Sequence, residues 1–260
     1  MGDSVLSVVQ GIVFDLDDTL ISKADWVVPA MEFAAAKLGL DPQRVTELAM
    51  QYIRSKGVAD AGIYNHVLIE CGQSDSAVNI RAFVAWCNQY VPSMNKLGLV
   101  AGVPDTLIDL AKHYRLAVIA DGPVEFQRAK VQACGLEDYV RDIIYSDSIE
   151  GSKSRKPDPR PYQQAQSRLD TQSLQTMFVG DNPYKDFTSP RRLGWVTVRV
   201  MMGEFSSLEY PSRDRMADYD VPSVPWLRQL FEQHPAPRNT RVLRLDAQSK
   251  DPTAGLAKIS

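Results

Sequence analysis

Two aspartates near the start of the chain have the types and spacing for covalent chemistry on phosphorus. Asp15 and Asp17 directly follow the apolar run of residues 11–14 and are separated by one residue. A loop that curls at the end of a strand can aim both carboxylates into one pocket, where one attacks phosphorus and the other protonates the leaving oxygen. A second carboxyl that its surroundings hold protonated can act first as an acid and then as a base. The pair therefore suits hydrolysis in two steps through an aspartyl-phosphate.

Short apolar runs that end in acidic or small polar residues recur along the chain and predict the strands that position this pair. They are residues 11–14, 116–120, 142–145, 177–179 and 195–200. Continuous apolar runs are typical of a parallel sheet that is covered on both faces. We therefore predict an α/β fold with a Rossmann-like, doubly wound parallel sheet, in which ligands bind at the carboxyl ends of the strands. The residues at these ends are Asp15, Asp121, Ser146 and Asp181.

Helices are expected between the strands and in one long insertion. In the core they should cover residues 104–113, 124–134, 159–169 and 183–193, and a last strand (219–221) and helix (224–231) should follow. The insertion should hold helices at residues 29–38, 42–56, 61–71 and 76–91, because apolar residues there recur at helical spacing. We thus predict an α/β core of residues 1–20 and 104–235, an inserted α-helical cap of residues 21–103, and a C-terminal tail of residues 236–260.

Composition excludes several classes of function. The chain has 260 residues and a formal net charge of -3, whereas binding to a nucleic-acid backbone needs clustered Lys and Arg. No apolar run approaches the roughly 20 residues that span a bilayer, and the first residues lack the layout of a signal peptide. Three widely separated cysteines form no CxxC pair, so we expect reduced thiols in a cytoplasmic protein without nucleic-acid or membrane partners.

The segment FDLDDTL, residues 14–20, resembles the first motif of the haloacid dehalogenase (HAD) superfamily. The resemblance extends over about residues 8–204 and implies a Rossmann-like core with a type 1 helical cap, most often in a phosphatase. It implies that Asp15 is the nucleophile and that Asp17 is the general acid and base. It also implies that the backbone carbonyl of Asp17 is a ligand of Mg²⁺, and it makes Thr19 a supporting residue.

Two later segments extend the resemblance. Lys156, in the sequence KPDP, resembles the lysine that bridges the nucleophile and the phosphate, and it is preferred over Lys153 and Arg155 because only it precedes the proline pair. The segment that begins at Gly180 resembles the family's GDxxxxD motif, which implies that Asp181 and Asp15 are the carboxylate ligands of Mg²⁺ and that Asp186 is a supporting residue. Carboxylate and carbonyl oxygens are the ligands that Mg²⁺ prefers.

One motif departs from the family pattern. The family places Ser or Thr at the end of the second core strand, where its hydroxyl binds a phosphoryl oxygen, but this chain has Ala120. A lost transition-state donor of this kind costs about 2–4 kcal/mol. The backbone N–H groups of Asp121 and Gly122 remain available for binding phosphate.

These observations lead to one preferred function and two alternatives. We expect a Mg²⁺-dependent phosphohydrolase that cleaves a small phosphate monoester, either a sugar phosphate or a nucleotide. Because of Ala120, a weakly active or inactive binding protein on the same fold is the first alternative. A phosphosugar mutase, which would use the same residues, is the second. A dehalogenase needs neither Asp17 nor Asp181, so these two residues argue against that activity.

Overall fold

The computed structural model describes residues 5–56, 62–90 and 97–233, and this part of the chain contains a parallel sheet of six strands. The strands are β1 (Gly11–Asp15), β2 (Arg115–Ala120), β3 (Asp142–Tyr145), β4 (Thr176–Gly180), β5 (Val196–Val200) and β6 (Tyr219–Val221). Their order is β3-β2-β1-β4-β5-β6, and each neighbouring pair is parallel. The expected α/β, Rossmann-like fold class is confirmed.

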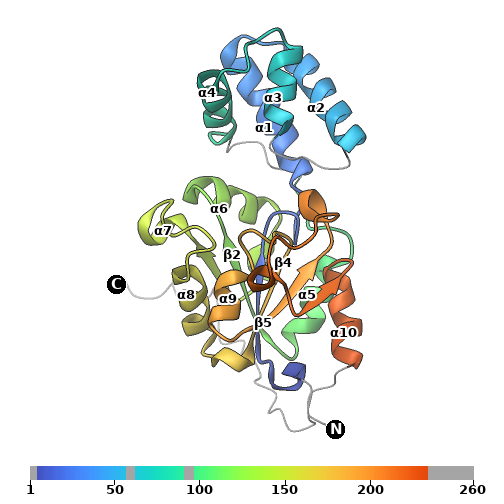
Figure 1. Cartoon of the computed structure of the whole chain (residues 1–260), viewed down its shortest axis with the longest axis vertical. Helices are drawn as coiled ribbons and strands as arrows, with labels where there is room; N and C mark the ends of the chain where they lie inside the picture. Colours follow the sequence, from blue (N-terminus) through green and yellow to red (C-terminus); the bar gives the residue numbers. More distant parts are fainter. Residues whose placement is uncertain (1–4, 57–61, 91–96, 234–260) are drawn as a thin grey trace, which may run out of the picture.

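The centre of the sheet lies at β1, which pairs with β2 on one side and β4 on the other (Figure 1). Every residue of β1 is buried, as its continuous apolar sequence predicts. In this strand order the connections turn to opposite sides after β1 and β4. A crevice forms outside the carboxyl ends of two such strands, and open α/β sheets bind ligands there. Asp15 ends β1 and Asp181 directly follows β4.

Helices cover both faces of the sheet. Successive side chains of β1 point to opposite faces, so Ile12 and Phe14 belong to one hydrophobic cluster and Val13 to the other. The first cluster takes in α5 (Val103–Ala111), α6 (Val124–Ala133) and α10 (Leu227–Gln233), and the second takes in α8 (Arg160–Leu169). The remaining core helices are α7 (Asp147–Glu150) and α9 (Thr188–Arg192), with short 3-10 helices at Val5–Val8, Leu136–Asp138, Ser173–Gln175, Gly203–Phe205, Arg213–Arg215 and Val224–Trp226.

Four further helices form a bundle above the carboxyl ends of the strands (Figure 1). They are α1 (Ala24–Leu38), α2 (Pro42–Lys56), α3 (Gly62–Glu70) and α4 (Ala77–Cys87). Apolar residues at helical spacing hold the bundle together, such as Val27, Met31 and Ala34 of α1, which are fully buried. No helix in the described part of the chain is long and apolar enough to cross a membrane. The expected tail, residues 236–260, lies outside the described residues.

Three expected helix boundaries were wrong. The helix expected over residues 76–91 is α4, which ends at Cys87. Helix α1 begins at Ala24 rather than at Pro29, because the buried Val27 and Val28 extend its apolar face toward the core. The helix expected over residues 183–193 is only α9. Residues 182–186 instead form a turn in which the backbone N–H groups of Lys185 and Asp186 donate to the carbonyl of Asn182.

Candidate active site

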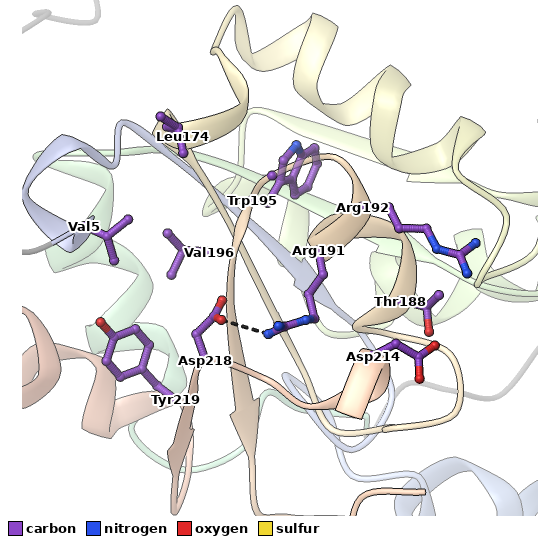
Figure 2. Close-up of a pocket in the computed structure, with 11 residues that line it drawn as sticks. Val5, Leu174, Thr188, Arg191, Arg192, Trp195, Val196, Asp214, Asp218 and Tyr219 are labelled. Atoms are coloured by element: carbon purple, nitrogen blue, oxygen red, sulfur yellow. Dashed lines mark hydrogen bonds and ion pairs between the residues drawn. The ribbon is translucent and has the colours of Figure 1, made fainter. Parts of the chain in front are cut away.

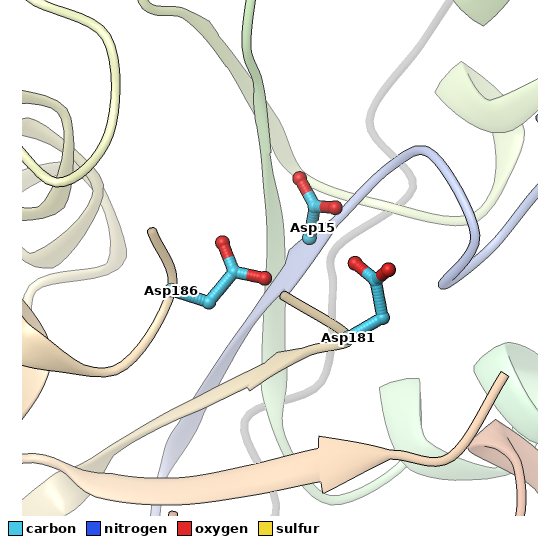
Figure 3. Close-up of side chains that lie close together, drawn as sticks. All are labelled: Asp15, Asp181 and Asp186. Atoms are coloured by element: carbon cyan, nitrogen blue, oxygen red, sulfur yellow. The ribbon is translucent and has the colours of Figure 1, made fainter. Parts of the chain in front are cut away.

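Acidic side chains converge at the crevice between β1 and β4. Asp15, Asp181 and Asp186 point toward one another (Figure 3), and one carboxylate oxygen of each lies within 4.8 Å of the other two. All three residues are buried. The close approach requires glycine at the end of β4, because a Cβ on Gly180 would collide with the carboxylate of Asp186 and would lie 2.9 Å from the ring of Phe178.

Lys156 places a positive charge inside this group. It lies in the loop before α8, and its Nζ donates to Asp15 Oδ1 and, over 2.7 Å, to Asp186 Oδ1. Its side chain is only 3% exposed. Burial alone would lower the pKa of Lys156, but the carboxylates of Asp15 and Asp186 raise it well above its ordinary value. Lys156 is therefore a permanent cation in direct contact with Asp15.

The carboxylates outnumber this cation, and their pKa values show the imbalance. Burial, opposed by Lys156, raises the pKa of Asp15 to about 7. Burial and the nearby carboxylates of Asp186 and Asp15 raise the pKa of Asp181 well above its ordinary value. With all three carboxylates ionised, one lysine leaves a net charge of two negative units in a buried space. This arrangement of oxygen ligands fits a divalent cation, which would balance the charge.

Asp17 lies beside the group and is fixed by two donors. Its Oδ1 accepts from the indole Nε1 of Trp26 (2.6 Å), and its Oδ2 accepts from Lys130 Nζ (2.5 Å). These two donors hold both oxygens of the Asp17 carboxyl in place. Burial lowers the pKa of Lys130, and the charge of Asp17 opposes that shift.

Sequence reasoning missed both donors. Trp26 gives no signal by itself, since tryptophan commonly serves packing. Lys130 does give a signal in the sequence. It lies four residues after Phe126, so α6 carries a charge on the same face as a buried aromatic ring. A lysine on the apolar face of an amphipathic helix needs a partner, and Asp17 is that partner.

The loop that departs from the family pattern is joined to the loop of Lys156. Ala120 is fully buried and belongs to the hydrophobic core. Asp121 Oδ1 accepts from the backbone N–H of Lys156 (3.0 Å), which ties the end of β2 to the lysine loop. Gly122 has φ of +138°, and a Cβ there would lie 2.7 Å from the side-chain nitrogen of Gln127, so this position requires glycine.

A second set of contacts joins the start of the bundle to the core. Asp18 accepts from the backbone N–H groups of Lys23 (2.9 Å) and Glu204 (3.3 Å). The side chains of Lys23 and Glu204 form an ion pair of 2.5 Å. Burial raises the pKa of Asp18, while these two backbone donors oppose the shift. Thr19 is fully buried, and its Oγ1 has no hydrogen-bond partner among the described residues.

These residues enclose a cavity of about 310 Å³. Of the residues expected from the sequence, it is lined by Asp15, Asp17, Asp121, Lys156, Asp181 and Asp186, whereas Thr19 and Gly122 do not line it. Its wall also includes Lys23, Trp26, Asn182, Lys185, Glu204 and Phe205. A space of this size suits a phosphoryl group with a small organic part.

A larger hollow of about 700 Å³ lies at the amino ends of β5 and β6 and contains none of these residues (Figure 2). Two of its charged residues pair with each other: Arg191 binds Asp218 over 2.8 Å, as the dashed line in Figure 2 marks. The converging carboxylates, the buried lysine and the strand-end position all favour the smaller cavity as the active site.

Comparison with known proteins identifies the family of this chain. Residues 12–200 match the sequence model of the family described as haloacid dehalogenase-like hydrolase. A glyceraldehyde 3-phosphate phosphatase of Methanocaldococcus jannaschii is 26% identical, over 83% of this chain and 94% of its own. A plasmid-encoded phosphoglycolate phosphatase of Cupriavidus necator is 30% identical, over 74% of this chain and 80% of its own.

Solved structures agree with the fold. The crystal structure of a predicted phosphoglycolate phosphatase from Haemophilus somnus superimposes with a TM-score of 0.61 at 19% identity, covering 86% of this chain and 98% of that one. The family match covers most of the described core and includes every strand except β6 and the first residue of β1. The chain therefore belongs to the haloacid dehalogenase-like hydrolase family, as a phosphatase-like member.

Proposed function

We propose that this protein is a Mg²⁺-dependent phosphatase that hydrolyses small phosphate monoesters through an aspartyl-phosphate on Asp15. The observation that carries the proposal is the contact of Lys156 with Asp15 inside a buried group of carboxylates at the crevice. We also propose that residues 21–103 act as a cap over a core made of residues 1–20 and 104–235, since α1 to α4 stand above the carboxyl ends of the strands (Figure 1).

In the first step, a carboxylate oxygen of Asp15 forms a bond to phosphorus, and the bond between phosphorus and the ester oxygen breaks. Asp17, protonated for this step, gives its proton to the leaving oxygen. Lys156 stabilises the negative charge on the transferring phosphoryl oxygens and keeps Asp15 oriented. Little reorganisation is needed during the reaction, because Asp186 accepts from the side chain of Lys156 and Asp121 accepts from its backbone N–H.

In the second step, Asp17 is ionised and takes a proton from water, which attacks phosphorus and releases phosphate from Asp15. The observed contacts of Asp17 with two donors suit this ionised state. Asp15, Asp181 and the backbone carbonyl of Asp17 are the residues that would hold Mg²⁺. When bound, the ion would neutralise phosphoryl charge as a Lewis acid.

The nature of the relatives supports a small phosphorylated metabolite as substrate. Their names specify glyceraldehyde 3-phosphate and phosphoglycolate. They also support an enzyme rather than a protein that only binds phosphate, although this chain has alanine at position 120. The cavity volume is consistent with a substrate of the size of a sugar phosphate.

A phosphate-release assay tests the proposal. The purified protein should hydrolyse p-nitrophenyl phosphate and members of a panel of phosphorylated metabolites when Mg²⁺ is present. The Asp15→Asn variant should lose activity by roughly 10⁴-fold or more, because the nucleophile is removed. Asp105→Asn, which changes an exposed aspartate of α5, is the matched control and should keep full activity. Activity that survives in Asp15→Asn would exclude the covalent route, and a protein inactive on every phosphate ester would contradict the proposed function.

A further inference from the structure

Lys130 is a buried charged residue whose position is not explained by a gain in stability. Its side chain is completely buried on α6, and its ammonium lies 4.5 Å from the centre of the Trp26 ring and 5.3 Å from that of Phe126. Taking an ammonium out of water is unfavourable, and an apolar side chain of similar size often makes the fold equally or more stable at such a site. The placement of this charge therefore calls for a reason other than packing.

The contact that Lys130 makes supplies the reason. Its Nζ donates to Asp17 Oδ2 over 2.5 Å. Lys130 does not line the active-site cavity, whereas Asp17 and Trp26 do. Oδ2 is thus held by a side chain that does not line the cavity, whereas Oδ1 accepts from Trp26, which does.

We propose that Lys130 is a positioning residue: it fixes one oxygen of the Asp17 carboxylate so that the other faces the substrate's leaving oxygen and, later, the attacking water. This inference rests on the proposed role of Asp17 as general acid and base. A carboxylate that could rotate freely would present the reactive oxygen only part of the time, and misplacement by about 1 Å can cost 10²-fold in rate.

Trp26 fits the same arrangement. Its indole N–H donates to Oδ1 over 2.6 Å, which is the position where the O–H of a water molecule would donate during the second step. Trp26 belongs to α1, the first helix of the bundle, while Lys130 belongs to the core. Lys130, from the core, thus holds Oδ2. Trp26 is the donor at Oδ1 that substrate or water replaces.

A direct role of Lys130 on the phosphoryl group does not fit the structure. Lys156 already provides a cation that lines the cavity and contacts Asp15. The cation of Lys130 does not line the cavity and contacts Asp17 and two aromatic rings. Lys130 should therefore affect proton transfer and leave phosphate binding largely unchanged.

Dependence on the leaving group tests this inference. For p-nitrophenyl phosphate the leaving group needs no proton, so kcat/KM should fall only about threefold in Lys130→Met. For an alkyl phosphate such as glycerol phosphate the leaving oxygen must be protonated, and kcat/KM should fall by roughly 30-fold or more, within the range of general acid catalysis. Lys130→Arg, which keeps a cationic donor, should recover most of the loss on the alkyl ester. KM should change little in each case, because phosphate binding is intact.

Asp17→Asn separates failure of this inference from failure of the proposed function. Its kcat/KM should also fall more on the alkyl ester than on p-nitrophenyl phosphate. Adding Lys130→Met to this variant should lower kcat/KM little further, because both changes act on one carboxylate. If Asp17→Asn affects both esters equally, the role of Asp17 is wrong and the inference falls with it. If Asp17→Asn shows the preference and folded Lys130→Met does not, only the role of Lys130 is wrong.

Folding must be checked by circular dichroism for each variant. A general loss of structure lowers activity on both esters together, so the ratio between them remains informative. If Lys130→Met does not fold, Lys130→Gln provides the measurement, because its amide can still donate to Asp17 without a charge. We expect the ratio to change in the same direction and by less; an unchanged ratio in this folded variant overturns the proposal.

Discussion

The charge imbalance at the crevice predicts how the metal-free protein responds to pH. The carboxyl of Asp15 has a pKa of about 7 in the folded chain, against an ordinary value of 3.8. The folded state therefore keeps a proton on this group over a range in which the unfolded chain has already lost it. An acid with a raised pKa stabilises the fold at low pH, and this contribution is lost as pH rises from about 4 through 7.

The size of the effect follows from the pKa difference of Asp15. Linkage gives a loss of about 2.5 kcal/mol in the free energy of unfolding between about pH 5 and pH 8. For a domain of this size that corresponds to a fall of about 5–10 °C in Tm. Asp181, whose pKa is raised as well, acts in the same direction.

Thermal unfolding in the presence of a chelator measures this loss. The wild-type protein should have a lower Tm at about pH 8 than at pH 5, and Asp15→Asn, which cannot ionise, should show a smaller fall. Added Mg²⁺ should raise the wild-type Tm more at the higher pH, because the ion binds the ionised carboxylates. Equal pH dependence in the two proteins would refute the electrostatic reasoning, and so would a wild-type Tm that rises with pH.

Three further changes have defined outcomes. Lys156→Met should lower kcat/KM by about 10²–10³-fold, because a preorganised charge is lost. A substrate titration with Mg²⁺ present measures this, and a decrease of less than threefold would exclude this lysine from the mechanism. Gly180→Ala should lower the free energy of unfolding by about 1–3 kcal/mol, because the added methyl group collides with Asp186; urea unfolding measures this, and a neutral result would contradict the packing. Lys23→Ala should change the free energy of unfolding by less than about 1 kcal/mol, because its ion pair with Glu204 is partly exposed. A larger decrease in the same assay would show that this pair holds the bundle on the core.

The sequence predicted the sheet well because the strands are continuous apolar runs. The run at residues 11–14 became β1, and the runs at 142–145 and 177–179 became β3 and β4 within two residues at either end. Parallel strands share one carboxyl edge, so residues that end separate runs had to approach one another. This geometric rule predicted from the sequence alone that Asp15 and Asp181 lie close together, as they do in the structure.

The parts that were not predicted depend on contacts between distant segments. The helix expected at residue 183 was replaced by a turn, because the carboxylate of Asp186 folds back to accept from the backbone N–H of Asn182. Lys130 lies 113 residues from Asp17, and although its place on the apolar face of α6 indicates that it needs a partner, no local pattern identifies that partner. The boundaries of the cap remain a prediction, as do the roles of the individual site residues.

Trapping of the covalent intermediate tests the central claim most directly. The protein should be mixed with substrate and Mg²⁺, quenched in acid within a single turnover, digested, and analysed by mass spectrometry. We predict one added phosphoryl group on the peptide that contains Asp15, located on that carboxyl, and none in Asp15→Asn. Hydrolysis that proceeds with every peptide unmodified, or with the phosphoryl group on another residue, would contradict the account.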